Sequence, residues 1–584
     1  MAVDLKGNPF YLTDEEVKWV EDTYESLTTD ERLGQLFCGS INPFDPQGQE
    51  NIAKLGFGGY MIRPFQMAGL KEAIAASQKM CKVPLLISGN LEYGGSGVIN
   101  EGTTLQMPMG CTATGDMENG YRLGKISAAE ATAVGLNWGY APIIDIDMNY
   151  RNPITNIRAF SSKKEEVLAM ASGYLRAAKE ENMAVSIKHF PGDGSDERDQ
   201  HLLVSVNQCT ADEWRDSYGW IYKNMIEQGA RTVMVGHIAQ PAVAKSVNPA
   251  ISEEEAHYPA SLSKTMITDV LRGELGFNGL AVTDSTLMVG YMQKLPRKIA
   301  LPTSIEAGID MILFNRDQAE DIAFMKEGYE KGILSEERLK EAVYRILALK
   351  ASLKLPEKMA NGTIEPEADP ATIIGQPLFK EWAAEAAKKS PTLVKAKDGI
   401  LPLSPDKKKR IYLNVIESEV NDESPFALNM KERFEKEGFD VTLRKRTLKI
   451  NVESILSGKM DEDTMAAMAE LNATTESFVS QYDMAVIIVD IPTQSNATVV
   501  RINWSVLAGM GQDIPWYAGE MPLVVVSFAN PYHLLDIPMA DVYVNAYNDA
   551  PVIIDAVMDK LMGRDEFVGV SPVDAFCGHS DCRV

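Results

Sequence analysis

Short, almost continuously apolar runs alternate with longer amphipathic stretches between residues 34 and 315. In the longer stretches, apolar residues recur every three to four positions, which is typical of helices with one buried face. Residues 163–182 and 210–229 are examples. Apolar strands separated by helices predict a parallel sheet covered on both faces. The strand-like runs lie at residues 34–41, 55–62, 83–90, 136–145, 183–190, 231–238, 279–285 and 308–315.

Eight such strand and helix units within about 300 residues predict an N-terminal (β/α)8 TIM barrel. Enzymes with this fold build their active sites from the C-terminal ends of the strands. Polar side chains stand at those positions here, which predicts one shared site at the barrel mouth. They are Asn90, Asp145, Asp147, Lys188, His189, His237, Asp284 and Asn315.

A second domain is predicted beyond the barrel, because 584 residues are too many for one hydrophobic core. A helix over 335–353 gives way to a stretch rich in Pro, Gly and charge, which is typical of a linker. Further strand-like runs, interleaved with helical segments, predict a smaller C-terminal α/β sandwich. This part of the sequence lacks a Gly-rich phosphate loop, which argues against a nucleotide site. The predicted parts are a catalytic barrel at 1–353, a linker at 354–376 and the sandwich at 377–584, with strands at 409–415, 439–445, 483–491, 522–530 and 541–547.

The net charge of -25 argues against nucleic acid and anionic membranes as partners, because both are bound through basic surfaces. The first twenty residues lack the apolar core of a secretion signal, and no run of about 18 apolar residues follows. We therefore expect a cytoplasmic protein. A homodimer is left open.

Six scattered cysteines fit reduced thiols better than a disulfide framework. One cluster, Cys577-Gly-His579-Ser-Asp-Cys582, contains metal-ligating residue types. Its spacing matches no standard zinc pattern and it lacks a second ligand pair. We predict neither a metal nor a cofactor.

The densest polar stretch, Lys188 to His201, follows the fifth apolar run, and its Pro and Gly residues predict a loop. Asp199 and His201 are two residues apart, so in an extended loop both side chains can point the same way. A carboxylate beside an imidazole fixes its tautomer and stabilises its protonated form, which suits a general acid and base. The alternative is a solvated loop with incidental charges.

Two further positions offer glycosidase chemistry. Asp284 ends a wholly apolar run, where a carboxylate can attack an anomeric carbon, although an Asp here could also cap the next helix. Arg158, in the stretch that follows the fourth run, offers planar paired donors for sugar hydroxyls or an amide carbonyl, or forms a surface ion pair instead.

Together these segments resemble glycoside hydrolase family 3 in its β-N-acetylglucosaminidase branch. The resemblance spans nearly the whole chain and includes APIIDIDMNYRNPITNIRAFS, SIKHFPGDG, DQH, LRGELGFNGLAVTDS and IEAGIDMILF. It implies that Asp284 is the nucleophile and that His201, oriented by Asp199, is the acid/base. It also implies that Arg158, Lys188 and His189 hold the sugar that is cleaved.

The chain departs from the family pattern at two places. Asp193 stands where the usual Lys-His-Phe-Pro-Gly-His-Gly has its second histidine, which adds a carboxylate near the dyad. The family's Asp-x-Glu-Gly-Gly-Arg segment reads Asn90-Leu-Glu92-Tyr-Gly-Gly-Ser here, without the arginine. Asn90 and Glu92 remain candidate sugar-binding residues, as does His237, which has no firm role. The alternative is that the protein binds this sugar more weakly or binds a different sugar.

These residues predict a retaining exo-β-N-acetylglucosaminidase that acts on small β-linked carbohydrates through a covalent glycosyl-enzyme. An imidazole in place of a carboxylic acid removes a negative charge, so phosphate would be less repelled and phosphorolysis is an alternative to hydrolysis. The same residues also fit a β-glucosidase or a β-xylosidase, and a non-catalytic sugar-binding protein could keep the fold without turnover.

Overall fold

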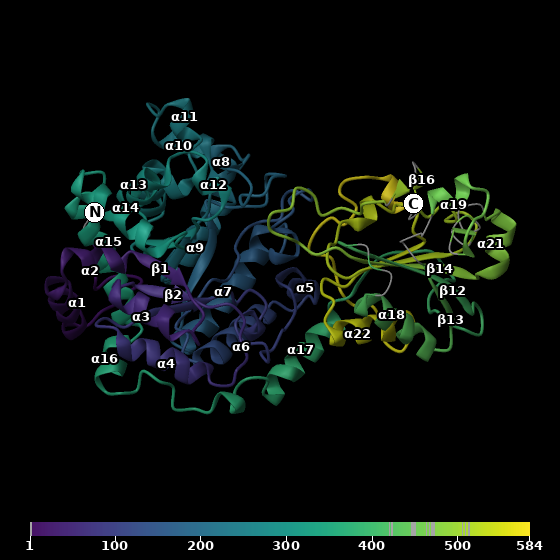
Figure 1. The fold of residues 1–584 in the computed structure, drawn as a ribbon, viewed down its shortest axis with the longest axis horizontal. Helices are drawn as coiled ribbons and strands as arrows, with labels where there is room; N and C mark the ends of the chain where they lie inside the picture. Colours follow the sequence, from purple (N-terminus) through teal and green to yellow (C-terminus); the bar gives the residue numbers. More distant parts are fainter. Residues whose placement is uncertain are drawn as a thin grey trace. The chain divides into compact units, whose positions relative to one another are not determined.

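The chain forms two compact units in the computed structural model, which is drawn in Figure 1. The first comprises Met1–Thr112, Asp116–Ala386 and Ser495–Thr498, and the second comprises the remainder. Their division falls inside helix α17 (Pro377–Lys389), later than the predicted start of the second domain at residue 377. The structure describes residues 3–584 except 420, 422–423, 445–450, 463, 466–467, 469–472, 505, 508–509 and 512–513.

Eight parallel strands among the described residues of the first unit close into a barrel, in the order β1-β10-β9-β7-β5-β4-β3-β2. Each lies within one of the eight predicted runs, so the predicted TIM barrel is confirmed. The strands are β1 (Phe37–Ser40), β2 (Gly59–Met61), β3 (Leu86–Gly89), β4 (Trp138–Gly139), β5 (Ala184–Phe190), β7 (Thr232–Val235), β9 (Leu280–Ser285) and β10 (Met311–Leu313).

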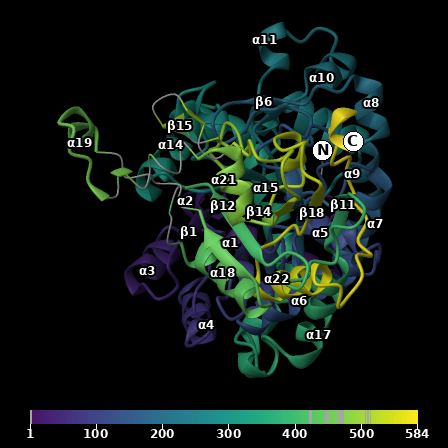
Figure 2. The same cartoon turned by 90° about the vertical axis from the view of Figure 1, so that its right-hand side faces the viewer.

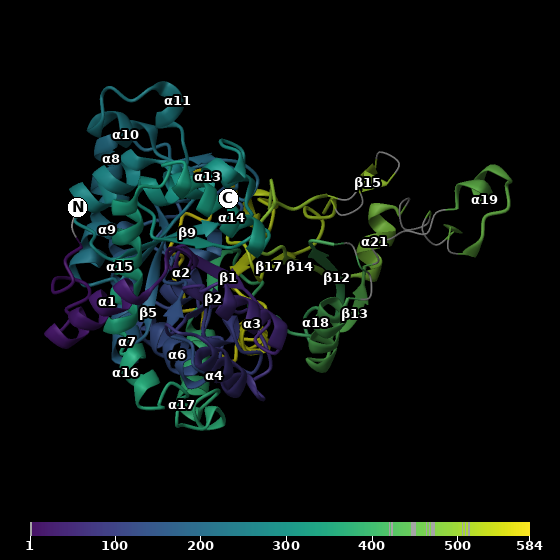
Figure 3. The same cartoon turned by 60° about the vertical axis from the view of Figure 1, so that its left-hand side comes forward.

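Helices α7 (Lys164–Glu180), α9 (Tyr218–Glu227) and α15 (Glu336–Ser352) lie outside the ring of strands (Figure 3). The helix predicted over 210–229 is divided into α8 (Ala211–Asp216) and α9 at Ser217. The Ser217 hydroxyl donates to the Glu213 carbonyl, a local bond that competes with continuation of the helix. None of the described helices combines the length and the apolarity needed to cross a membrane.

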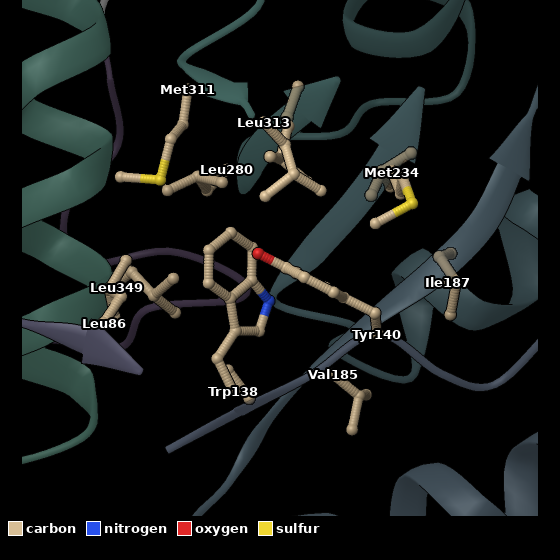
Figure 4. Close-up of a cluster of buried hydrophobic side chains, with 14 of the residues drawn as sticks. Leu86, Trp138, Tyr140, Val185, Ile187, Met234, Leu280, Met311, Leu313 and Leu349 are labelled. Carbon is tan, nitrogen blue, oxygen red and sulfur yellow. The ribbon is translucent and has the colours of Figure 1, made fainter. Parts of the chain in front are cut away.

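Large side chains fill the barrel interior (Figure 4). Trp138 packs edge-on against Tyr140, with ring centroids 4.9 Å apart. The Trp138 indole N–H donates to the hydroxyls of Ser186 and Thr232, each at 2.9 Å, and so joins β4 to β5 and β7. A filled interior confines chemistry to the strand ends.

The described part of the second unit contains a six-stranded sheet (Figure 2). Helices α18 (Pro425–Lys436) and α22 (Pro551–Leu561) share an apolar core with it. Aromatic rings around Tyr412 and Phe478 form a separate cluster. The predicted C-terminal sheet domain is confirmed. In spatial order its strands are β11 (Thr392–Ala396), β18 (Val542–Asn545), β17 (Leu523–Ser527), β14 (Met484–Asp490), β12 (Arg410–Glu417) and β13 (Asp440–Leu443).

The apolar runs of the sequence do not mark β11, which pairs antiparallel with β18 at the edge of this sheet. Most of its side chains are only partly buried, so it lacks the continuous apolar run that marks a central strand. The run predicted at 439–445 contains β13, and its last residue lies outside the described residues.

Candidate active site

Strand β9 delivers Asp284 to the barrel mouth. The strand is buried through Thr283, and the Asp284 side chain emerges with 15% of its surface exposed. The next helix, α12 (Val289–Met292), has Met288 at its N-cap. The alternative role of Asp284 as a helix cap is therefore wrong, and its carboxylate is left to face the site.

The pKa of Asp284 lies below its ordinary value. Burial raises this pKa, but electrostatic interactions with His189, His237 and His201 and the hydrogen bond from the Ser285 backbone N–H together lower it further, so the net shift is downward. The nearest approach is 3.9 Å, between His189 Nε2 and Asp284 Oδ2. An ionised carboxylate is the form that a nucleophile requires.

Asp199 and His201 form the predicted pair on the loop after β5. His201 Nδ1 lies 2.6 Å from Asp199 Oδ1, and the backbone N–H of His201 donates to the same oxygen at 2.8 Å. The Asp199 side chain is completely buried, whereas 24% of the His201 side chain is exposed. With Nδ1 held by the carboxylate, Nε2 is the nitrogen that can exchange a proton with a ligand. The alternative of a solvated loop is wrong.

The second oxygen of Asp199 also has a fixed partner. It accepts the backbone N–H of Asn496 at 2.7 Å, from the short segment Ser495–Thr498 that belongs to the first unit. Nothing in the local sequence connects Asn496 with Asp199, because they are almost three hundred positions apart.

Glu92 joins two cations from different segments, Arg158 in the 3-10 helix η2 (Asn156–Arg158) and Lys188 in strand β5. Arg158 donates to both Glu92 oxygens at 2.9 Å, and Lys188 Nζ lies 2.7 Å from one of them. Glu92 is 8% exposed, so the alternative of a surface ion pair for Arg158 is wrong. Burial raises the pKa of Glu92, but the two cations lower it well below its usual range. Glu92 therefore positions both cations.

His189 is oriented in a similar way by Asp145, which the sequence marked only as a strand-end residue. His189 Nδ1 lies 2.7 Å from Asp145 Oδ2, and the His189 backbone N–H donates to Asp145 Oδ1 at 3.0 Å. The pairing leaves Nε2 of His189 directed at Asp284.

His237 differs from the other predicted sugar-binding residues. Its ring nitrogens lie 2.8 Å from the Ser261 hydroxyl and 2.9 Å from the Ser285 carbonyl oxygen, and burial lowers its pKa to about 4. No ring nitrogen is left for a sugar, so we assign His237 to positioning Ser285, beside the nucleophile. Asn90, after β3, is half-buried, and its amide makes no hydrogen bond to any described residue.

Comparisons with known proteins agree with this geometry. The family model described as "Glycosyl hydrolase family 3 N terminal domain" matches residues 28–349. The chain belongs to glycosyl hydrolase family 3. The resemblance drawn from the motifs is therefore confirmed, and the chain is an enzyme of the glycoside hydrolase class.

Three family 3 relatives are similar to most or all of the chain. The "Beta-N-acetylglucosaminidase/beta-glucosidase" of Cellulomonas fimi is 38% identical over the full length of both chains. The solved structure "Beta-glucoside phosphorylase BglX bound to 2FGlc" is 42% identical, with a TM-score of 0.90, and covers 98% of this chain and 99% of its own. A β-N-acetylglucosaminidase from Paenibacillus sp. str. FPU-7, 24% identical with a TM-score of 0.75, covers 94% of this chain and 99% of its own, and shares the fold.

In the described part of the chain, no group of His, Cys, Asp or Glu side chains is arranged to hold a metal ion. The chemistry available at the barrel mouth is that of the ionised Asp284, the His201 and Asp199 pair, and the two cations held by Glu92.

Proposed function

We propose that this family 3 enzyme cleaves β-glycosides of N-acetylglucosamine or glucose with retention of configuration. The observation that carries the proposal is the Asp284 carboxylate at the end of β9 and the carboxylate-paired imidazole of His201 at the same barrel mouth. His201 donates a proton to the departing glycosidic oxygen while Asp284 attacks the anomeric carbon. Arg158 and Lys188, held by Glu92, bind the hydroxyls or amide of the sugar.

We further infer that phosphate is the acceptor in the second step. A phosphate oxygen attacks the anomeric carbon, the bond to Asp284 breaks, and His201 takes the proton of the attacking hydroxyl. The products are the glycosyl phosphate and the free Asp284 carboxylate. A carboxylate base in the place of His201 would repel the phosphate by about 1 to 4 kcal/mol at 4 Å, whereas an unprotonated imidazole carries no charge.

The comparison with the β-glucoside phosphorylase supports this acceptor, because the two chains are 42% identical over nearly their whole length. Hydrolysis of β-linked N-acetylglucosaminides is the second candidate. It is favoured by the name of the Cellulomonas fimi relative. This chain has Asn90 where the family pattern has an acid. The preference between N-acetylglucosamine and glucose is therefore a matter for experiment.

The covalent step is tested by intact-mass measurement after exposure to fluorinated glucosyl and N-acetylglucosaminyl donors that trap glycosyl-enzymes. We expect one adduct, on the peptide that contains Asp284, and none in Asp284→Asn. No adduct in the wild type, or an adduct that survives the substitution, contradicts the mechanism.

The acceptor is tested by turnover of aryl β-glycosides with phosphate, and with sulfate at the same ionic strength as the control. Phosphorolysis predicts a rate that rises with phosphate only, together with a glycosyl phosphate product seen by phosphorus NMR. Free sugar as the only product, at a rate independent of phosphate, would favour the hydrolytic candidate.

A further inference from the structure

Asp193 lies on the loop between β5 and the catalytic pair, and the mechanism above does not use it. The residue is buried, with 3% of its surface exposed. Its carboxylate contacts Gln200, the residue between Asp199 and His201 in the chain, through a bond of 3.2 Å from Gln200 Nε2 to Asp193 Oδ2.

The orientation of the Gln200 amide is fixed from its other end. Gln200 Oε1 accepts the backbone N–H of His237 at 2.8 Å. Only the amide oxygen can accept this hydrogen bond, so the NH2 group must point at Asp193. The Asp193 oxygen that faces it must therefore be an acceptor.

The other oxygen of Asp193 is constrained in the same way. It accepts from Asn152 Nδ2 at 3.0 Å and from the Gly194 backbone N–H at 2.7 Å. The Asn152 amide cannot turn over, because its own oxygen accepts the backbone N–H groups of Ile154 and Thr155. Both oxygens of Asp193 therefore face N–H donors, and the side-chain amides among these donors are held in one orientation by their other hydrogen bonds.

We propose that Asp193 is a positioning residue that holds Gln200, and through it the neighbouring Asp199 and His201, in the geometry needed for proton transfer. The inference rests on the proposed role of His201 as acid/base. It assigns a function to the position at which the chain departs from the family's usual histidine.

The titratable groups that face Asp193 are Asp145 from the segment after β4, His189 from β5 and Tyr218 from α9. Burial and the charge of Asp145 raise the pKa of Asp193 to about 6, although His189 and the hydrogen bonds from Gly194 and Asn152 oppose the shift. Protonation weakens the acceptor that Gln200 requires. Activity that depends on Asp193 is therefore present above about pH 6 and falls as the pH drops through this value.

A pair of substitutions and their combination test the proposal. Asp193→Asn places an NH2 group against that of Gln200, and Gln200→Glu places a carboxylate against that of Asp193. Combined, they restore a donor facing an acceptor, while Glu at position 200 still accepts the His237 N–H. Asp212→Asn, an exposed Asp on α8, is the matched control.

We expect each single variant to lower kcat on a phenyl β-glycoside by about 10- to 100-fold with little change in KM, because a misplaced catalytic group costs about that much. The double variant recovers at least several-fold over the worse single variant. We also expect the wild type to lose kcat as the pH falls through about 6, and Asp193→Asn to lack this fall. Unchanged single variants, or a double variant no better than the worse single one, would overturn the proposal.

Amide hydrogen exchange over residues 193–206 gives a readout that does not depend on turnover. Faster exchange in both single variants and slower exchange in the double variant are expected, with melting temperatures recorded to separate loosening of the loop from global unfolding. Unchanged exchange in folded single variants overturns the positioning role. Failure of the proposed function would instead appear as the absence of a trapped glycosyl-enzyme in the wild type, with these exchange differences intact.

Discussion

Glu92 accepts hydrogen bonds from both Arg158 and Lys188 while almost completely buried. Removing its charge leaves two cations without a counterion, and breaking such a buried arrangement costs about 3 to 5 kcal/mol. Because the pKa of Glu92 is lowered on folding, its stabilising contribution is fully present above its unfolded value, about 4.3. It is lost only as the pH falls toward the lower folded-state value.

We predict that Glu92→Gln raises KM for the sugar and lowers the unfolding midpoint at neutral pH. The matched control is Glu118→Gln, which removes one partner of a surface ion pair with Arg176. Such exposed pairs contribute about 0 to 1 kcal/mol, so the control should change KM and the unfolding midpoint very little. Kinetics and urea unfolding measure both effects, and equal shifts in the two variants would contradict the assigned role.

The carboxylate of Asp199 holds His201 by its Nδ1. Asp199→Asn keeps the shape of the side chain but no longer stabilises the imidazolium that protonates the leaving group. We predict a loss of about 10²- to 10⁴-fold in kcat on poorly activated glycosides, where acid catalysis is needed most. Dinitrophenyl glycosides, which need little protonation, should lose far less. A uniform loss across leaving groups would argue against acid catalysis by this pair.

At the scale of elements, Trp138 ties three neighbouring barrel strands together through one indole N–H. We predict that Trp138→Phe lowers the free energy of unfolding by about 1 to 3 kcal/mol for the lost hydrogen bonds, with a further cost for the cavity under the smaller ring. Urea unfolding measures the change. Trp516→Phe, at a half-exposed tryptophan of the second unit, is the control and should have a small effect.

At the scale of the whole molecule, helix α17 extends the first unit beyond the predicted linker. Phe379, Ala383 and Ala386 belong to the hydrophobic core that contains the barrel. We predict that a fragment ending at residue 389 melts at a higher temperature than one ending at 376, which lacks these side chains. Phe379→Ala in the longer fragment should remove most of the difference, since burying a phenylalanine contributes about 3 to 5 kcal/mol. Equal melting temperatures would place the boundary at 377.

The sequence by itself determined the elements and the reactive groups whose signals are local. The eight barrel strands are marked by continuous apolar runs, and the Asp199 and His201 pair by a spacing of two residues. Asp284 is marked by its position directly after a buried strand. Each signal depends only on neighbours in the chain, because strand burial and side-chain direction follow from local periodicity.

Only the tertiary structure decided how these groups are held. Glu92 meets Arg158 and Lys188, and Asp145 meets His189, because barrel closure brings different strands and the segments that follow them to one mouth. Only the structure likewise shows that both ring nitrogens of His237 have hydrogen-bond partners, which excludes this residue from sugar binding. Which of these side chains pair depends on the packing of residues far apart in the chain, whereas local periodicity reports only which positions are buried and which face each side chain takes.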